Sequence, residues 1–348
     1  MHNFWSRLKY QAYDAIHFLK KMSATKLVNF FKVLAAFYFS RAVKKPHMAG
    51  SPVSISIEPT TSCNLRCPQC ISGTRTFTRP TGMMDLDDFK GVISQLRRKL
   101  VNLTLYFQGE PFLHPAFFEM VGYAGKNRIY TMTSTNGHYL TRGNAAKVII
   151  AGLDRIIISV DSFNQETYSA YRVGGNIETV ISGIGNLVNV RKEMNATRPL
   201  IILQFLVFRA NEDQIEQLRN TAYRMGADKV DFKTMQIYDY ANGSSFIPGN
   251  KKYSRYIQNQ SGTYEVKADY YNHCWKMWHS CVITWDTRVV PCCFDKDASH
   301  AMGNLRELGE FKRIWMNETY REFRSRILNS RKSIDICSNC TEGTSYWV

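Results

Sequence analysis

The chain has 348 residues, of which 44% are hydrophobic and 13% aromatic; this composition is typical of a globular protein and excludes a largely disordered one. The sequence shows no signal-peptide pattern and no apolar run long enough to span a bilayer, so we expect a cytoplasmic protein. In that reducing compartment the nine cysteines are expected to bind metal or take part in catalysis rather than form disulfides.

The formal net charge of +16 is uneven, because residues 1–48 hold nine Lys and Arg residues against the single acid Asp14. Apolar residues such as Trp5, Leu8 and Ala12 recur there at helical steps, which predicts amphipathic helices. We weigh two interpretations and favour the first: a helical extension packed on the main domain, or an interfacial helix pair in peripheral contact with an anionic membrane. No recognisable nucleic-acid-binding motif accompanies the charge, so no nucleic-acid partner is expected.

Residues 49–240 alternate between apolar runs of strand length and helix-length segments, which predicts an α/β fold with a parallel sheet. Strands are expected near Val53–Glu58, Val101–Phe107, Tyr130–Thr135, Arg155–Asp161, Leu200–Val207 and Lys229–Met235. Helical patterns lie near Leu86–Lys99, Pro115–Lys126, Arg142–Ala151, Gln165–Asn195 and Glu212–Met225. Polar stretches follow the first four strands directly, and that edge of a parallel sheet is where chemistry is expected.

Two further regions follow. Residues 241–270 are rich in Gly, Ser, Asn and Tyr, which indicates a linker or a lid. Residues 271–348 hold six of the nine cysteines and are expected to form a compact unit of their own.

The loop after the first predicted strand reads "SCNLRCPQC", with cysteines at Cys63, Cys67 and Cys70. Three thiolates can hold three corners of a metal cluster and leave the fourth corner for substrate. A zinc site would need a fourth Cys or His nearby, and the next histidine, His114, is distant in sequence. Thiolate ligation of this kind fits an iron–sulfur cluster better.

With this motif the sequence resembles the radical S-adenosylmethionine (SAM) superfamily over residues 50–348. The resemblance implies a partial (β/α)6 TIM-like barrel, and a [4Fe–4S] cluster held by Cys63, Cys67 and Cys70 whose unique iron binds SAM. It further implies reductive cleavage of SAM to a 5′-deoxyadenosyl radical that abstracts a substrate hydrogen, fed by a low-potential electron donor such as flavodoxin or ferredoxin.

Other stretches match the SAM-binding motifs of the family, at the ends of the second, third and fourth strands. The residues that the resemblance assigns to SAM binding are Gly109, Glu110 and Pro111 of "QGEP", Ser134 and Asn136 of "STNG", Ser159, and Arg172. Arg172 would pair with the SAM carboxylate. The plainer alternatives are that Glu110 only caps the following helix and that Arg172 only forms a surface ion pair. One departure is Gln69, which stands where the family usually places an aromatic residue against adenine.

The C-terminal cysteines resemble the SPASM or twitch extension of radical SAM enzymes, which holds auxiliary clusters. The best four-ligand set for one auxiliary [4Fe–4S] cluster is Cys274, Cys292, Cys337 and Cys340. Cys293 is an alternative to Cys292, and Cys281 is expected to be a buried apolar residue outside the set. A zinc ribbon is the competing interpretation of this unit and is less favoured, because the first motif already indicates cluster chemistry.

The expected function is therefore hydrogen abstraction and oxidative modification of a substrate, with dehydrogenation as one outcome and the auxiliary cluster as electron acceptor. Side chains near strand ends that could serve as a base or position substrate are Tyr106, Gln204, Lys233 and Tyr238. Two alternatives stay open: a maturase that crosslinks a ribosomally made peptide, and a non-catalytic partner that binds an iron–sulfur cluster or SAM. The substrate class, whether small molecule, peptide or lipid, does not follow from the sequence.

Overall fold

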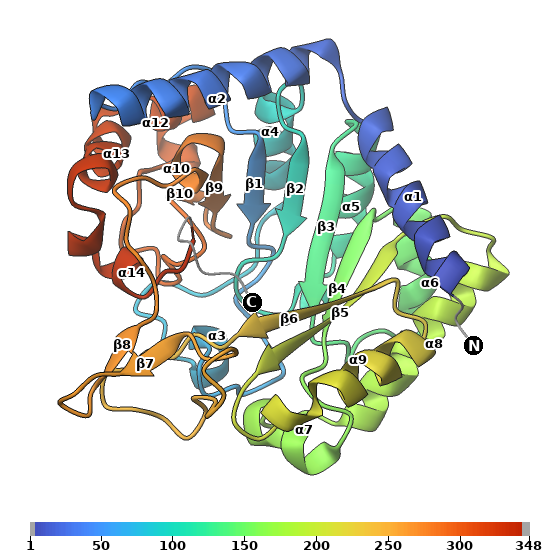
Figure 1. Ribbon diagram of the computed structural model, residues 1–348. Helices are drawn as coiled ribbons and strands as arrows, with labels where there is room; N and C mark the ends of the chain where they lie inside the picture. The colour runs from blue at the N-terminus through green and yellow to red at the C-terminus, as the bar shows by residue number, and fades with distance from the viewer. Residues whose placement is uncertain (1–3, 343–348) are drawn as a thin grey trace.

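The computed structural model describes residues 4–342, with side chains from residue 8 onwards; the side chain of Trp5 in the predicted helical pattern and residues 343–348 of the predicted C-terminal unit lie outside this description. Its main sheet has nine strands in the order β11-β10-β9-β1-β2-β3-β4-β5-β6. A second sheet pairs β7 with β8. The ribbon shows the large sheet curving around a central space, with helices on its outer side (Figure 1).

Six parallel strands stand side by side in chain order and confirm the predicted (β/α)6 arrangement. They are β1 (Ser54–Ile57), β2 (Asn102–Leu105), β3 (Tyr130–Thr135), β4 (Arg155–Ser159), β5 (Leu200–Val207) and β6 (Lys229–Thr234). The helices that follow them are α3 (Ile71–Thr74), α4 (Leu86–Leu96), α5 (Phe117–Lys126), α6 (Arg142–Ala151), α7 (Gln165–Tyr171), α8 (Ile177–Glu193) and α9 (Ile215–Arg224), with 3-10 turns η1 (Pro111–Leu113) and η2 (Glu212–Gln214).

Alternation along each strand separates the core from the site. In β1, Ile55 and Ile57 are fully buried, whereas Ser56 between them lies on the opposite face, toward the central space. Leu103 and Leu105 of β2 repeat the pattern around Thr104. The apolar face is buried against the helices because successive side chains of a strand point to opposite sides of a sheet.

One predicted element differs in the structure. The helical pattern over Gln165–Asn195 forms two helices, α7 and α8, instead of one. The first helix ends at Tyr171, and the break contains Gly174, with φ of +82°, and Asn176, whose side chain accepts a hydrogen bond from the Thr179 amide at 3.0 Å. A left-handed glycine followed by an asparagine cap is a local stop and start signal.

The C-terminal unit continues the same sheet. Strand β9 (Ser280–Ile283) pairs in parallel with β1, and β10 (Arg288–Val290) and β11 (Gly303–Asn304) follow in antiparallel pairing. The helices of this unit are α10 (Lys276–His279), α11 (Leu305–Leu308), α12 (Phe311–Trp315), α13 (Glu318–Ser330) and α14 (Asp335–Ser338), with the 3-10 turn η3 (Arg331–Ser333). Because β9 pairs with β1, the sheet fixes the position of the C-terminal unit relative to the cysteine loop that follows β1.

The predicted linker or lid contains a small hairpin of β7 (Tyr256–Gln258) and β8 (Tyr264–Val266). It is anchored by Tyr256, which is 2% exposed. The Tyr256 hydroxyl accepts a hydrogen bond from the Ile237 amide at 2.8 Å and donates one to Asn339 Oδ1 at 2.9 Å. The segment therefore connects the end of the barrel to the C-terminal unit through a buried side chain.

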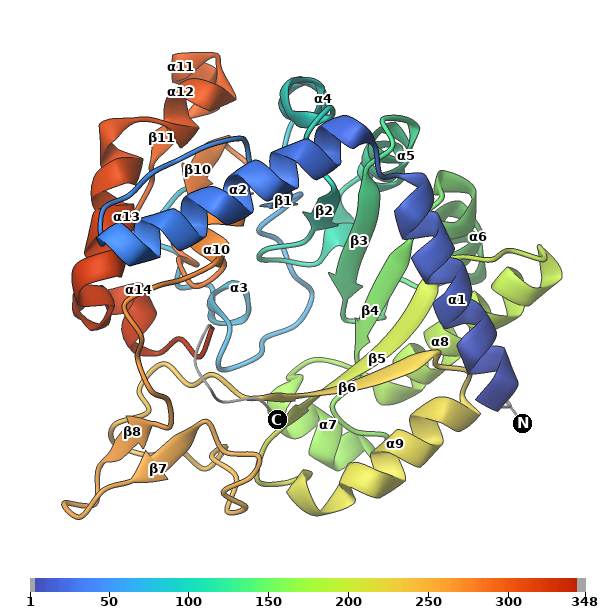
Figure 2. The same cartoon turned by 45° about the horizontal axis from the view of Figure 1, so that its top comes forward.

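The N-terminal leader forms α1 (Phe4–Lys20) and α2 (Ala24–Val43), which lie across the amino ends of the strands (Figures 1 and 2). Asp14 pairs with Arg155 at the start of β4, and Lys21 pairs with the buried Asp154. Val33 and Phe37 of α2 are buried in the main core. The leader is thus packed on the main domain, as the first interpretation expects. Among the described residues, none of the helices combines the length and apolar character needed to cross a membrane.

Candidate active site and cluster sites

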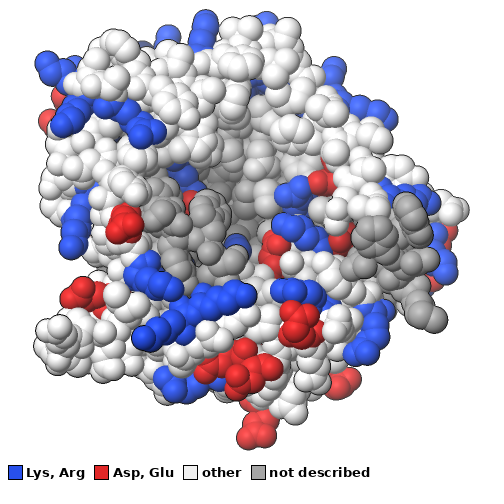
Figure 3. Space-filling model, in the orientation of Figure 1, with Lys and Arg blue, Asp and Glu red and all other residues white. Residues whose placement is uncertain are grey.

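A hollow of about 520 Å³ lies at the carboxyl ends of the parallel strands; we call it the central hollow. It is visible as the recess in the middle of Figure 3. The predicted site residues that line it are Cys63, Cys67, Cys70, Gly109, Glu110, Ser134, Asn136, Ser159 and Arg172. Pro111 is not among its lining residues; it begins the buried turn η1. Residues more than one hundred positions apart are thus brought to one surface by the parallel sheet.

The cysteine loop is held against the motif that follows β2. The Glu110 amide donates to the Ser62 carbonyl oxygen at 2.7 Å, and the Gly109 amide donates to Ser72 Oγ at 2.9 Å. Gly109 has φ of +73°, and a Cβ added to it would lie 2.3 Å from the Thr60 carbonyl oxygen. Only glycine permits this close approach of two backbones.

The Glu110 carboxyl group joins the motifs of the second and third strands. It is 2% exposed and accepts hydrogen bonds from the Phe112 amide at 3.2 Å, Thr135 Oγ1 at 2.7 Å and the Asn136 amide at 2.8 Å. Glu110 therefore does cap the turn that follows it, as the plainer alternative expects, but the same carboxyl group also fixes the third-strand motif. Burial raises the pKa of Glu110 to about 7, against the opposing effect of these hydrogen bonds.

Arg172 does not form the surface ion pair that was the plainer alternative. Its side chain is 13% exposed, and its Nε donates to Asp161 Oδ2 at 2.6 Å. Its Nη1 stands 3.9 Å from Cys67 Sγ. Asp161 is fixed in turn by the Leu206 amide at 2.7 Å, so the guanidinium is oriented beside the cysteine loop.

Gln69, the position at which the family pattern is not followed, contacts the segment that leads into the linker. Its Oε1 accepts a hydrogen bond from the Tyr238 amide at 2.9 Å. The ring of Tyr238 lies 4.6 Å from Lys296 Nζ. An aromatic residue distant in sequence is thus brought near the third cysteine of the loop.

Of the four side chains considered as base or positioning residues, Tyr106, Gln204 and Lys233 line the central hollow and Tyr238 does not. Burial raises the pKa of Tyr106 well above its ordinary value, so this phenol keeps its proton. Burial lowers the pKa of Lys233. Among these side chains, Lys233 is therefore the one whose pKa is shifted in the direction that favours accepting a proton at neutral pH.

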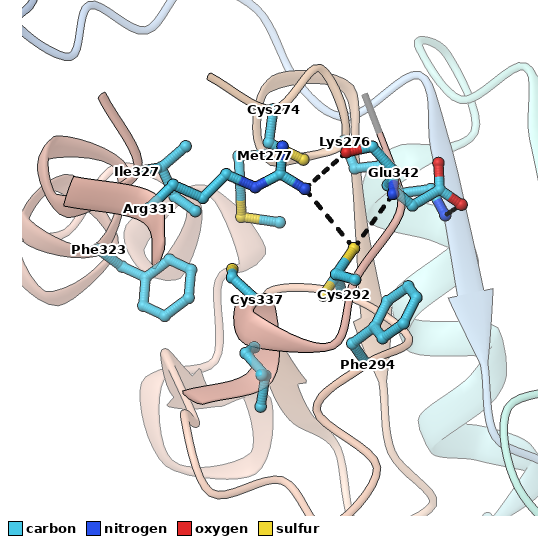
Figure 4. A pocket seen from close by; sticks show the side chains of 12 residues that line it. Cys274, Lys276, Met277, Cys292, Phe294, Phe323, Ile327, Arg331, Cys337 and Glu342 are labelled. Carbon is cyan, nitrogen blue, oxygen red and sulfur yellow. Dashed lines mark hydrogen bonds and ion pairs between the residues drawn. The ribbon is translucent and has the colours of Figure 1, made fainter. Parts of the chain in front are cut away.

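A second hollow, the C-terminal hollow, is lined by Cys274, Cys292, Cys337 and Cys340 (Figure 4). Apolar side chains complete most of the wall, including Met277, Phe323 and Ile327. Arg331 Nη2 lies 3.6 Å from Cys340 Sγ. The structure thus gathers the four-cysteine set chosen from the sequence.

Cys293, the sequence-based alternative to Cys292, faces elsewhere. It lines the central hollow, and its Sγ lies 3.7 Å from Lys276 Nζ. Lys276 lines both hollows. Cys281 is 2% exposed in the main core, as expected of a buried apolar residue.

The donor atoms of both hollows suit iron–sulfur clusters. Each hollow is walled by cysteine sulfurs, which are the ligands such clusters take. Burial raises the pKa of the Cys63 and Cys337 thiols to about 11 and that of Cys340 to about 12, so ligation requires a strongly positive partner that displaces the protons. No group of three or more His, Cys, Asp or Glu among the described residues converges closely enough for a single metal ion.

Sequence reasoning missed two lysines in the wall of the central hollow, Lys276 and Lys296, beside the expected Lys233. Lys276 follows Cys274 by two residues, and Lys296 follows Cys293 by three. Proximity to the cysteines was the available signal. Basic residues are common on surfaces, however, and spacing alone does not distinguish a lysine that lines the site from one on the surface.

Comparison with known proteins agrees with this geometry. Residues 57–222 match the radical SAM superfamily, and residues 274–341 match the SPASM iron–sulfur cluster-binding domain. The mycofactocin maturase MftC of Mycolicibacterium smegmatis is 26% identical over 313 residues, which cover 83% of this chain and 76% of that protein.

Two solved structures share the fold. Streptococcus suis SuiB bound to the precursor peptide SuiA has a TM-score of 0.62 at 11% identity, covering 87% of this chain and 73% of that one. BtrN in complex with AdoMet and 2-DOIA has a TM-score of 0.53 at 19% identity, covering 85% of this chain and 95% of that one. The matched regions imply SAM, a SAM-binding [4Fe–4S] cluster and an auxiliary cluster as cofactors. The chain belongs to the radical SAM superfamily and carries a C-terminal SPASM domain.

Proposed function

We propose that Cys63, Cys67 and Cys70 hold the SAM-binding cluster and that SAM lies in the central hollow beside them. The three cysteines and the strand-end motifs line one continuous wall of that hollow. When bound, the reduced cluster and SAM supply a 5′-deoxyadenosyl radical, with flavodoxin or ferredoxin as electron donor. Residues 49–240 would then be the catalytic barrel and residues 271–348 the auxiliary domain.

The chain's own residues bind and orient SAM in this proposal. Gly109 presents backbone at the hollow, and Glu110 supports it by tying the second and third strand motifs together. Arg172, oriented by Asp161, directs its remaining N–H groups at the SAM carboxylate. Ser134, Asn136 and Ser159 provide further polar contacts along the wall.

The observation that supports an oxidative reaction is the placement of Cys292 and Cys293. These consecutive residues line two different hollows, Cys292 the C-terminal one and Cys293 the central one. A cluster held by Cys274, Cys292, Cys337 and Cys340 would lie next to the central hollow and could take up the electron that a two-electron oxidation releases. Dehydrogenation is the simplest reaction of this kind.

The wall of the central hollow favours a substrate with an anionic group. Lys276 and Lys296 line it on the side of the C-terminal unit; Lys276 Nζ is already paired with Glu342 at 2.7 Å, so Lys296 is the one of the two that is directed at a substrate. Lys233 lies on β6 in the same wall, and its lowered pKa suits it to accept the proton of the oxidised carbon. Carboxylate or phosphate groups are the ligands that such a lysine cluster binds.

A peptide-modifying maturase is the second candidate, and the relatives favour it. MftC is named a maturase, and SuiB was solved with a precursor peptide. The described residues of the leader form two helices and no strand, so a winged-helix-like peptide binder is not found there. A peptide substrate would have to be held by the hollow itself or by a separate protein.

The test is anaerobic reconstitution followed by reduction and assay of 5′-deoxyadenosine. Wild type should form it, the Cys63→Ala/Cys67→Ala/Cys70→Ala variant should not, and Cys281→Ala, a buried cysteine outside both sets, should still form it. Product formation from wild type without an added partner argues against a non-catalytic role. Its absence, with SAM bound, would overturn the proposed enzyme.

A further inference from the structure

The helix α2 carries apolar side chains on two faces that differ in their surroundings. Its inner face, with Val33, Ala36 and Phe37, is buried in the main core. Its outer face, which we define as Leu27, Val28, Phe31, Ala35, Tyr38 and Phe39, is exposed to solvent. Phe31 is 60% exposed and Tyr38 57%, which is unusual for aromatic side chains on a folded domain.

The outer face is a continuous stripe. At 3.6 residues per turn its six residues fall within an arc of about 120°. Within that arc the described side chains of α2 include none that is charged. Helix α1 also exposes apolar side chains at helical spacing, Leu8, Ala12 and Leu19, of which Leu19 is 67% exposed. Scattered exposed apolar residues need no explanation, but a contiguous stripe marks an interaction surface.

Positive charge borders this stripe. Lys32 and Arg41 lie on the two sides of it on α2, and Lys44 and Lys45 follow the helix. Where Figure 3 shows the upper edge, along which α2 runs, the surface is mostly white with blue patches beside it. An apolar face bordered by lysine and arginine is the pattern of a helix that lies in the headgroup region of a membrane.

A basic hollow of about 280 Å³ lies at the turn between α1 and α2. The described residues that line it include no Asp or Glu; its cations are Lys21, Lys26, Arg97, Arg98, Lys126 and Arg128. Lys21 is paired with Asp154 and Lys26 donates to backbone carbonyl oxygens, whereas Arg97, Arg98 and Lys126 reach the hollow from the ends of α4 and α5. Phosphate groups at a membrane surface would complement this charge.

We propose that the outer face of α1 and α2 docks on an anionic phospholipid membrane. The positive charge beside the stripe favours a membrane over a second copy of the chain as the partner of this face. Two copies meeting through this face would bring their basic borders together, whereas an anionic bilayer accepts both the apolar stripe and the lysines. The proposal does not depend on the function proposed for the central hollow.

The geometry also fixes how the docked protein is oriented. The leader contacts residues at the starts of strands, such as Tyr130 and Arg155, whereas the site residues stand at the strand ends. The central hollow therefore lies at the opposite end of the strands from the docked edge. Docking recruits the enzyme to the surface and gives no reason to expect a lipid as substrate.

Flotation of the full-length protein with vesicles tests this. Wild type should float with vesicles of equal parts phosphatidylcholine and phosphatidylglycerol and much less with phosphatidylcholine alone. Leu27→Ser/Phe31→Ser should lower the bound fraction by about tenfold or more. Ile150→Ser, which changes a side chain that is 73% exposed on α6, should leave binding unchanged.

A second set of variants tests the contribution of the lysines to binding separately from that of the apolar stripe. Lys32→Glu/Lys44→Glu should weaken binding and its salt dependence, whereas Lys192→Glu on α8 should not. Unchanged far-ultraviolet circular dichroism and 5′-deoxyadenosine formation in the variants would show that folding and the central hollow are intact. Wild type that fails to float, binding that survives the double serine variant, or a dimer in sedimentation that the same variant dissociates would each overturn the proposal.

Discussion

The neighbouring residues Cys292 and Cys293 are expected to respond in opposite ways to substitution by serine. Cys292 lines the C-terminal hollow with three other cysteines, whereas Cys293 lines the central hollow beside Lys276. Serine keeps the size of the side chain but is a poor ligand for iron. Cys292→Ser should therefore lose one cluster and Cys293→Ser none.

The magnitude is set by the ligand count. With both four-cysteine and three-cysteine sets occupied by four-iron clusters, wild type and Cys293→Ser should contain about eight irons per chain, and Cys292→Ser about four. Iron and sulfide analysis after anaerobic reconstitution measures this, and electron paramagnetic resonance of the reduced protein counts the cluster signals. In Cys292→Ser the remaining cluster should still support SAM cleavage, because Cys63, Cys67 and Cys70 are untouched.

The opposite result would refute the reasoning. If Cys293→Ser dropped to about four irons while Cys292→Ser kept about eight, the auxiliary cluster would be held from the central side. Loss of iron in both variants would indicate that the two residues support one site together, and the proposed electron path between the hollows would then have no basis.

Gly109→Ala should prevent assembly of the first cluster, because the added Cβ would lie 2.3 Å from a backbone carbonyl oxygen. Iron analysis should then give about four irons per chain, whereas Gly91→Ala on α4 should keep about eight; a wild-type count for Gly109→Ala would contradict this. Because burial raises the pKa of Glu110 from 4.5 to about 7, the folded protein before reconstitution binds a proton there that the unfolded chain has lost. Stability should fall by roughly 3 kcal/mol as the pH rises across that window, and urea unfolding at several pH values should show the slope removed in Glu110→Gln. Asp228→Asn should cost about 3–5 kcal/mol in urea unfolding, since it removes the counter-charge of the buried Arg191; an unchanged midpoint would sink this explanation.

Much of the barrel could be predicted because its signals are local. The strands Tyr130–Thr135 and Leu200–Val207 and the helix Arg142–Ala151 have the predicted bounds. Each is an apolar run bounded by turn or cap residues within a few positions of its ends. Where a stop signal was read as part of a helix, at Gly174 and Asn176, the prediction merged two helices into one.

The pairing of the barrel with the C-terminal unit could not be predicted in this way. β9 lies beside β1 although more than two hundred residues separate them, and no local pattern specifies that register. The same holds for Asp161 beside Arg172 and for Gln69 beside Tyr238, which depend on how loops from different strands meet.

The sequence by itself determined the chemistry of this protein, since the spacing of Cys63, Cys67 and Cys70 within one loop is a covalent property that folding does not change. Only the tertiary structure decided which hollow Cys292 and Cys293 face, because the two residues follow β10 in irregular backbone whose path no local pattern specifies. It also decided which face of α2 is buried: apolar side chains stand on both faces, and the one that packs is set by the surface beneath it.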